Sequence, residues 1–356
     1  MSQKIPMNPA LILSAIAISI IALAAFGYML LEEENASPDP FPSSVSGNVT
    51  IYTSVPTSIV EAIKLEFLKS YPKINLTIFR AGTGSIMERI YDDLDQTGQV
   101  NADVIWLADF SNAEELKTEN LLQQYLSSET NKIIPIFIDQ DGYYTGSRLL
   151  NMVIAYNPNF VTTPPSGYDD LINPSWKGSI GLVNPITSGS AFYAVSTLAM
   201  DDNFGWEFIE DLNNSNCEIV RTNPTLVNNI SAGDLYLGIT IDYTVRQMLA
   251  NDPTLSVAYS YPVNGSIAVV SPIALSRDCI NLETSKLFID WVLSKKGQAF
   301  LSNNYGIAPV RTDVELPEGM IPLDKLKVIP SNPEEISQNK ASTIAQFASI
   351  FNISIS

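Results

Sequence analysis

The chain has 356 residues, a formal net charge of −18 and no histidine. This length suggests two domains, and the strong negative charge argues against nucleic acid or an anionic membrane surface as a partner. Without histidine, a Ser-His-Asp triad, a His-activated cysteine and a His-ligated zinc or copper site are excluded. Cys217 and Cys279 have no metal-type spacing, and they predict either a disulfide of an exported protein or two separate buried thiols.

The N-terminal part predicts a membrane anchor followed by a linker. Residues 10–31 form an almost unbroken apolar run, long enough to span a bilayer. Lys4 precedes this run and three glutamates follow it, so residues 1–9 are predicted to be cytoplasmic and the bulk of the chain to lie outside the cell. Secretion after signal cleavage is the alternative, because Ala22-Leu23-Ala24 is typical of a cleavage site. Residues 32–47 are acidic and rich in Pro and Ser, as expected of a linker.

From residue 48 onward, stretches with strand and helix patterns alternate along the chain. In chain order we predict strands at 48–54, 74–80, 103–108, 149–157, 178–183, 218–222, 235–241, 257–261 and 267–275, and helices at 58–70, 86–94, 112–120, 168–172, 191–200, 205–213, 226–231, 242–249, 282–293, 296–303 and 341–351. Such alternation predicts a mostly parallel sheet covered by helices.

A loop rich in hydroxyl groups joins the predicted strand 178–183 to the helix that follows it. The loop contains Thr187, Ser188, Gly189 and Ser190. One interpretation is a helix cap, in which a hydroxyl oxygen accepts a hydrogen bond from a free backbone N–H group. The other is an anion site, because a helix N-terminus offers N–H donors and a partial positive charge to a phosphate, phosphonate, sulfate or carboxylate. A second junction of this kind contains Thr83, Gly84 and Ser85.

Seven stretches, which together cover most of residues 49–311, resemble a known family in the family's order. They are VTIYTSVP (49–56), FLKSYPKINLTIFRAGTGSIMERI (67–90), ADVIWLAD (102–109), DGYYTGSRLLNMVIAYN (141–157), LINPSWKGSIGLVNPITSGSAF (171–192), YLGITIDY (236–243) and FIDWVLSKKGQAFLSNNYGIAPVR (288–311). The family is that of the periplasmic or extracellular solute-binding proteins of ABC importers, in the branch that holds ferric-ion-binding and 2-aminoethylphosphonate-binding proteins.

The resemblance implies an α/β fold of the two-lobed, periplasmic-binding-protein-like type II class. Two strands would cross between the lobes, and the lobes would close like a hinge around a ligand in the cleft. On this basis lobe 1 comprises 48–150 and 265–311, and lobe 2 comprises 151–264 and 312–356. The resemblance also implies a binding protein rather than an enzyme, without a cofactor, that delivers its ligand to an ABC permease and ATPase.

The iron-binding branch of the family uses a His, a Glu and two adjacent tyrosines. This sequence has Pro56 or a neighbour in place of the His, Ala108 in place of the Glu, and Tyr243 followed by Thr244 in place of the tyrosine pair. Most of the iron-binding set is therefore missing, and Tyr243 is the predicted metal ligand if iron is bound. The loop that holds the synergistic anion in this branch does match, at Ser188, Gly189 and Ser190.

We therefore predict a small anionic ligand of the phosphonate or organophosphate type, with ferric iron and a synergistic anion as the alternative. An extracellular enzyme or a surface-structural protein is less favoured, because neither a catalytic motif nor repeats are visible. Asp109 and Asp242 are predicted either to cap helices or to bind an ammonium group of the ligand, and Arg148 either to form a structural ion pair or to bind the anion. The predicted ligand-binding residues are Thr83, Gly84, Ser85, Asp109, Arg148, Thr187, Ser188, Gly189, Ser190, Asp242 and Tyr243.

Overall fold

A computed structural model describes residues 45–354 of the chain, and Val45–Ser356 form one compact unit. The predicted anchor at 10–31 and most of the predicted linker lie outside the described residues. Among those residues, no helix combines the length and the apolar character needed to cross a bilayer. Both cysteines are free thiols, so the predicted disulfide is not formed; Cys217 is buried, as the second alternative expects, and Cys279 is partly exposed.

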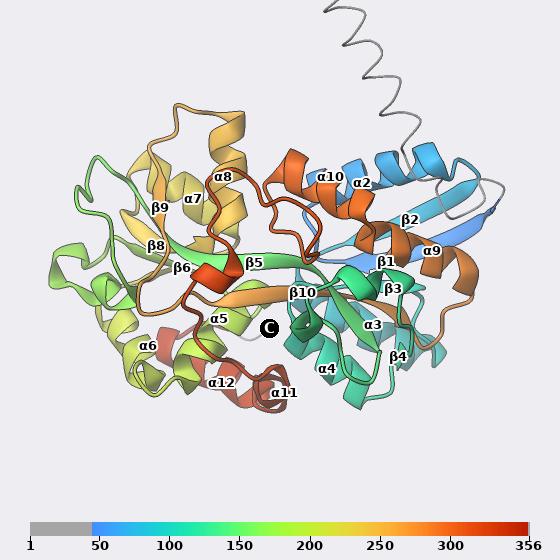
Figure 1. Ribbon diagram of the computed structural model, residues 1–356. Coiled ribbons are helices and arrows are strands. Elements are labelled where there is room, and N and C mark those ends of the chain that lie inside the picture. The colour runs from blue at the N-terminus through green and yellow to red at the C-terminus, as the bar shows by residue number, and fades with distance from the viewer. Residues whose placement is uncertain (1–44, 355–356) are drawn as a thin grey trace, which may run out of the picture. The chain divides into compact units, whose positions relative to one another are not determined.

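Strands and helices alternate through most of the chain, as predicted (Figure 1). The strands are β1 (Gly47–Thr53), β2 (Ile74–Arg80), β3 (Val104–Trp106), β4 (Leu122–Gln123), β5 (Tyr144–Tyr156), β6 (Ile180–Val183), β7 (Glu218–Val220), β8 (Leu237–Ile241), β9 (Ala258–Ser260) and β10 (Ala268–Ser276). The helices are α2 (Thr57–Ser70), α3 (Thr83–Thr97), α4 (Phe110–Thr118), α5 (Gly189–Met200), α6 (Gly205–Asn214), α7 (Asn223–Ala232), α8 (Asp242–Asn251), α9 (Leu282–Leu293), α10 (Lys295–Tyr305), α11 (Pro333–Gln338) and α12 (Lys340–Phe351).

The strands form one continuous sheet in the order β2-β1-β3-β10-β5-β8-β6-β7. β1 pairs in parallel with β2 and β3, and β6 pairs in parallel with β7 and β8. In the centre, β10 and β5 run antiparallel to each other and to the strands beside them. The prediction of a mostly parallel sheet is therefore right for the two ends and wrong for the centre, where two long strands pass between the ends in opposite directions.

The sheet is divided into two lobes, and strand β5 runs from one lobe into the other. It pairs with β10 over 144–151 and with β8 over 152–156. All of its residues are buried, which explains why the sequence shows a continuous apolar run here rather than an alternation. We call the part built on β1, β2 and β3 the first lobe, and the part built on β6, β7 and β8 the second lobe.

Helices cover both faces of the sheet in each lobe (Figure 1). In the first lobe α2, α9 and α10 lie on one face and α3 and α4 on the other. In the second lobe α7 and α8 lie on one face and α5 and α6 on the other. Amphipathic helices pack their apolar stripes on the sheet in this way, and the large buried side chains Phe67, Trp106, Phe192 and Phe288 lie in the resulting layers.

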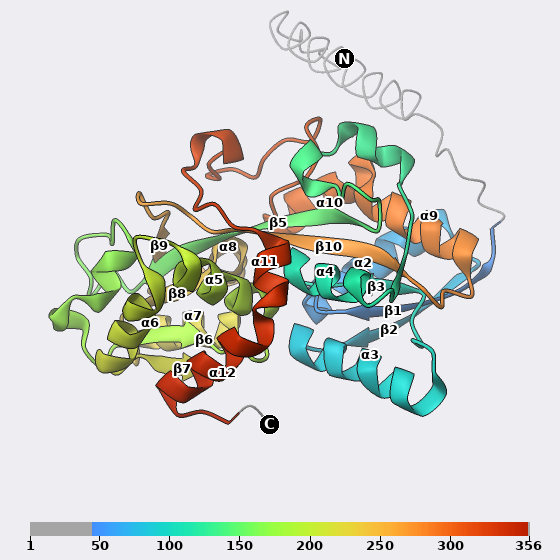
Figure 2. The ribbon, with the colours of Figure 1, turned by 90° about the horizontal axis from the view of Figure 1, so that it is seen from below.

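The C-terminal segment makes contacts with both lobes. The predicted late helix is present as α12, which packs on α5 and α6 of the second lobe (Figure 2). The short helix α11 before it, which the sequence analysis did not predict, packs mainly on α4 of the first lobe.

Candidate ligand-binding site

The two loops rich in Gly, Ser and Thr lie against each other in the structure. A Cβ atom on Gly82 would be 2.5 Å from the Thr187 carbonyl oxygen, and one on Gly84 would be 2.6 Å from the Ile186 carbonyl oxygen. Real Cβ atoms do not approach backbone oxygen this closely, so only glycine allows this contact between the lobes. The structure thus brings together two loops that are about 100 residues apart and that begin helices α3 and α5.

Three of the predicted residues meet where α5 begins. A Cβ atom on Gly189 would overlap Asp109 Oδ2 and would be 2.7 Å from Thr83 Oγ1. Thr83 is almost fully buried, and its hydroxyl has no hydrogen-bond partner among residues 45–354. Ser188 caps α5, since its Oγ accepts a hydrogen bond from Ala191 N at 3.4 Å, and it lies 3.2 Å from Ser190 Oγ. The cap and the close approach between the lobes therefore occur in the same loop.

Asp109 takes the capping role rather than that of a free carboxylate. It is fully buried at the start of α4, where Oδ1 accepts hydrogen bonds from Ser111 Oγ at 2.5 Å and from Asn112 N at 3.2 Å. The Asn112 amide donates to Oδ1 and Oδ2 at 2.9 and 2.8 Å. Burial raises the Asp109 pKa, and these donors and Lys340 partly oppose that rise. Asp109 is therefore not a spare carboxylate for a ligand ammonium group.

Asp242 is also engaged by protein groups. As the first residue of α8 it is fully buried and accepts hydrogen bonds from Tyr243 N at 2.7 Å and Tyr261 Oη at 2.8 Å. It forms an ion pair with Arg246 at 3.1 Å, and the Asn151 amide approaches it at 3.4 Å. The Arg246 charge is therefore balanced inside the protein, and Asp242 is not a free acceptor.

Arg148 on β5 differs from both aspartates, because much of its hydrogen-bonding capacity is unused. Its side chain is 2% exposed, and Nη2 donates to Ser271 Oγ at 2.8 Å. The guanidinium carbon lies 5.5 Å from the centre of the Trp106 ring. Nε and Nη1 have no hydrogen-bond partner among residues 45–354, and no Asp or Glu in that range forms an ion pair with Arg148. The predicted structural ion pair of Arg148 is therefore wrong.

Tyr243, the first hydroxyl-bearing residue of α8, lies next to the Arg148 guanidinium. Burial lowers the Arg148 pKa, and interaction with Tyr243 opposes that effect. Burial likewise raises the Tyr243 pKa, with Arg148 acting in the opposite direction, so the hydroxyl is protonated at neutral pH. A protonated phenol beside a buried cation can donate a hydrogen bond to an anion, whereas a ferric ion bound by Tyr243 would bring a second positive charge close to the Arg148 guanidinium.

Further polar atoms without partners were not predicted as part of the site. Ser54 Oγ, directly after β1, and Asn151 Oδ1, on β5, are both buried and without hydrogen-bond partners within the described part of the chain. Ser54 follows the carboxyl end of a parallel strand, where ligands of open α/β sheets bind. Its position in the sequence could therefore have identified it as a candidate site residue. Asn151 gave no such signal, because it lies within an apolar run.

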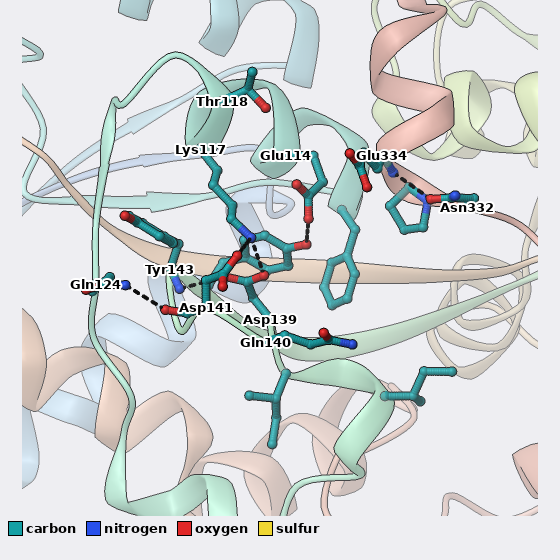
Figure 3. Close-up of a pocket in the computed structure, with 15 residues that line it drawn as sticks. Glu114, Lys117, Thr118, Gln124, Asp139, Gln140, Asp141, Tyr143, Asn332 and Glu334 are labelled. Carbon is teal, nitrogen blue, oxygen red and sulfur yellow. Dashed lines mark hydrogen bonds and ion pairs between the residues drawn. The ribbon is translucent and has the colours of Figure 1, made fainter.

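A pocket of about 710 Å³ lies between α4, residues 136–144 and the start of α11 (Figure 3). Its charged lining residues are acidic except for Lys117, which forms ion pairs there with Asp139 at 2.6 Å and Asp141 at 2.7 Å. Tyr144 also lines this pocket, with its hydroxyl bonded to Glu114. Within residues 45–354 no three His, Cys, Asp or Glu side chains are placed to hold a metal ion.

Comparisons with known proteins agree with this architecture. A family model described as bacterial extracellular solute-binding protein matches residues 101–333. The iron uptake protein A1 of Synechocystis sp. is 21% identical over 320 residues, which are 85% of this chain and 87% of that protein.

Two solved structures share the fold. The periplasmic binding protein AfuA from Actinobacillus pleuropneumoniae, with fructose-6-phosphate bound, has a TM-score of 0.79 and 21% identity, and the match covers 87% of this chain and 100% of AfuA. Iron-bound HitA from Pseudomonas aeruginosa has a TM-score of 0.76 and 19% identity, with 85% and 99% covered. The family model matches more than half of the chain, so the chain belongs to the bacterial extracellular solute-binding proteins.

Proposed function

We propose that the protein is the substrate-binding component of an ABC importer and that it captures a small anion of the phosphate-ester or phosphonate type by closure of its two lobes. The observation that carries this proposal is the buried guanidinium of Arg148, which has no carboxylate partner within the described residues. The apolar run at 10–31 supports tethering of this component to the membrane on the sequence alone.

A buried charge without a counter-charge is unfavourable for the folded protein. Removing a cation from water costs several kcal/mol unless an opposite charge or a set of hydrogen bonds compensates, and proteins normally pair such a group. Two donor nitrogens of Arg148, Nε and Nη1, have no hydrogen-bond partner within residues 45–354. An anionic oxygen would supply the missing charge and accept from these donors, which is the arrangement that arginine provides for phosphate groups.

The other polar groups of the candidate site also favour a ligand oxygen over a ligand cation. The hydroxyls of Thr83 and Ser54 are buried and free to donate. The two carboxylates, Asp109 and Asp242, are already satisfied by protein donors. The proposed ligand is therefore an anion. A ligand ammonium group would find no free carboxylate at Asp109 or Asp242.

The loops at 81–85 and 187–190 are proposed to close over the ligand. In their present contact the backbones of Gly82 and Thr187 leave no space between them, so a ligand would bind beside this contact, on the side of Arg148, or would hold the loops further apart. The structure of AfuA with fructose-6-phosphate bound supports a phosphate-bearing ligand for this fold.

Ferric iron with a synergistic anion is the second candidate, supported by the iron-bound relative HitA and by the buried Tyr243. A thermal-shift screen of the purified protein distinguishes the two. Fructose 6-phosphate, phosphonates, inorganic phosphate, sulfate and carboxylates are compared with ferric citrate. The correct anion should raise the free energy of unfolding by about 3–4 kcal/mol at several hundred to a thousand times its Kd.

No stabilisation by any of the anions would refute the proposed ligand class. A visible tyrosinate-to-iron absorption band that is lost in Tyr243→Phe would instead identify the protein as an iron carrier. For an organic anion, we expect Tyr243→Phe to retain most of the affinity, since it removes one neutral hydrogen-bond donor.

A further inference from the structure

The C-terminal segment forms a strap from one lobe to the other. α12 packs on α5 and α6 of the second lobe, and its Phe347 is fully buried. α11 packs mainly on α4 of the first lobe, and its Ile336 is fully buried. In Figure 2, α11 lies beside α4, and α12 runs on along the second lobe. The strap therefore has an apolar contact with each lobe, only a few residues apart in the chain.

Lys340, the first residue of α12, connects this strap to the first lobe by two hydrogen bonds. Its Nζ donates to Asn112 Oδ1 and to Glu115 Oε2, both at 2.6 Å. Both acceptors lie on α4, and the Lys340 and Glu115 side chains are about one-fifth exposed. At the other end of the strap, Ser331 Oγ and Tyr193 Oη of α5 share a hydrogen bond at 2.9 Å.

The contact of Lys340 reaches the candidate site through a single side chain. Because the Asn112 amide oxygen accepts from Lys340, its NH₂ group points the other way, and it donates to both carboxylate oxygens of Asp109. Asp109 Oδ2 in turn lies against Gly189, the first residue of α5. A chain of contacts thus runs from α12 through α4 and back to the second lobe at the loop 187–190.

We propose that Lys340 is a positioning residue for lobe closure: its bonds to α4 form only when the lobes are closed, and they hold Asn112 and Asp109 against the start of α5. In this proposal α12 moves with the second lobe, on which it packs, while α4 belongs to the first lobe, so opening of the cleft separates Nζ from both acceptors. Lys340 therefore shifts the equilibrium toward the closed state. This inference rests on the proposed capture by closure and is independent of which anion is captured.

The test measures closure without any ligand, by hydrogen–deuterium exchange of the purified protein. Exchange of the backbone amides in 81–85 and 186–190 reports opening, since these two loops are in contact only when the lobes are closed. We expect Lys340→Met to speed up exchange in both loops by about fivefold, the size that one partly exposed charged hydrogen-bond pair supports. Lys340→Arg, which retains the charge and donors, should exchange like the wild type.

Two further variants control for folding and for loss of charge. Glu115→Gln keeps the size of the side chain and removes the charge from one acceptor, so exchange should rise in the same loops but less than in Lys340→Met. Lys325→Met removes a lysine whose ion pair, within residues 45–354, is with the exposed Asp324, and it should change nothing in either loop.

Wild-type exchange in both loops of Lys340→Met and Glu115→Gln would overturn the proposal. Faster exchange confined to α12 would also overturn it, because it would show a local role in that helix alone. The thermal-shift screen with inorganic phosphate and fructose 6-phosphate is read separately. A failure of that screen counts against the anion, whereas a failure of the exchange experiment counts against Lys340.

Discussion

Two buried arginines, Arg148 and Arg311, show how differently the same side chain can be accommodated. Arg311 is 6% exposed and is bonded to Glu129 Oε2 at 2.5 Å, to Asp313 Oδ1 at 2.7 Å and to the Leu293 carbonyl oxygen at 3.0 Å. Arg148 is 2% exposed, and its neighbours are the Ser271 and Tyr243 hydroxyls and the Trp106 ring, with no carboxylate among them in residues 45–354.

The pKa values of the two guanidinium groups shift in opposite directions. Burial lowers both pKa values, but the hydrogen bonds that Arg311 donates to Asp313 and Glu129 outweigh burial there, and the Arg311 pKa is raised. For Arg148 nothing outweighs burial, and its pKa is lowered. When protein groups balance a buried charge, that charge has a structural role. When they do not, the site is a candidate for binding a ligand that carries the opposite charge.

The largest effect is expected for Arg148→Met, which removes the proposed anion partner. Affinity for the anion found in the thermal-shift screen should fall by about 4 kcal/mol, or roughly a thousandfold, because a buried charged hydrogen-bond partner is lost. The free energy of unfolding without ligand should stay the same or increase, since an unpaired buried charge is replaced by an apolar side chain of similar length. Isothermal titration calorimetry and urea unfolding measure the two quantities. A strongly destabilised protein would show that Arg148 is structural.

The matched change at the other arginine, Arg311→Met, should have the opposite pattern. It leaves Glu129 and Asp313 without their cation and should lower the free energy of unfolding by about 3 kcal/mol. Since this cluster lies away from the loops 81–85 and 187–190, the folded protein should bind the anion as the wild type does. Loss of affinity without loss of stability would remove the distinction between the two arginines.

The smallest effect is expected for Asp109→Asn, which tests a buried carboxylate held mainly by neutral donors. Its folded-state pKa is raised above the unfolded value, so the contribution of Asp109 to stability is full below the ordinary carboxyl pKa and is lost as the pH rises through the folded pKa. Asparagine can still cap the helix and has no charge to bury. We therefore expect the free energy of unfolding to rise by about 1 kcal/mol at neutral pH and to vary less with pH.

Urea unfolding of Asp109→Asn and wild type between pH 4 and 8 measures this difference. The new amide NH₂ would replace Oδ2, where it could donate to the unpartnered Thr83 hydroxyl, and the Asn112 NH₂ group would keep its hydrogen bond to Oδ1 and lose the one to Oδ2. If the free energy of unfolding changes equally with pH in the two proteins, ionised Asp109 does not destabilise the fold. Asp109 would then be a balanced buried charge like Arg311, and not an unbalanced one like Arg148.

Much of this fold follows from local patterns in the sequence. Strands β1, β2, β6 and β8 and the helices after them lie within a few residues of their predicted positions, because their periodicity and turn residues act over short distances. The antiparallel centre of the sheet was not predicted, since an apolar run such as β5 does not specify the direction of its neighbours. The two loops that begin α3 and α5 were identified from Gly, Ser and Thr at strand ends.

What the sequence by itself determined was therefore the kind of elements, the loops between them and the residue types available for an anion. Only the tertiary structure decided which of those residues are free. Asp109 and Asp242 are satisfied by neighbours, Arg148 is not, and Lys340 reaches Asn112 across 228 residues of chain. Pairing of a polar group depends on what distant segments place beside it, and that arises from packing of whole elements rather than from any local pattern.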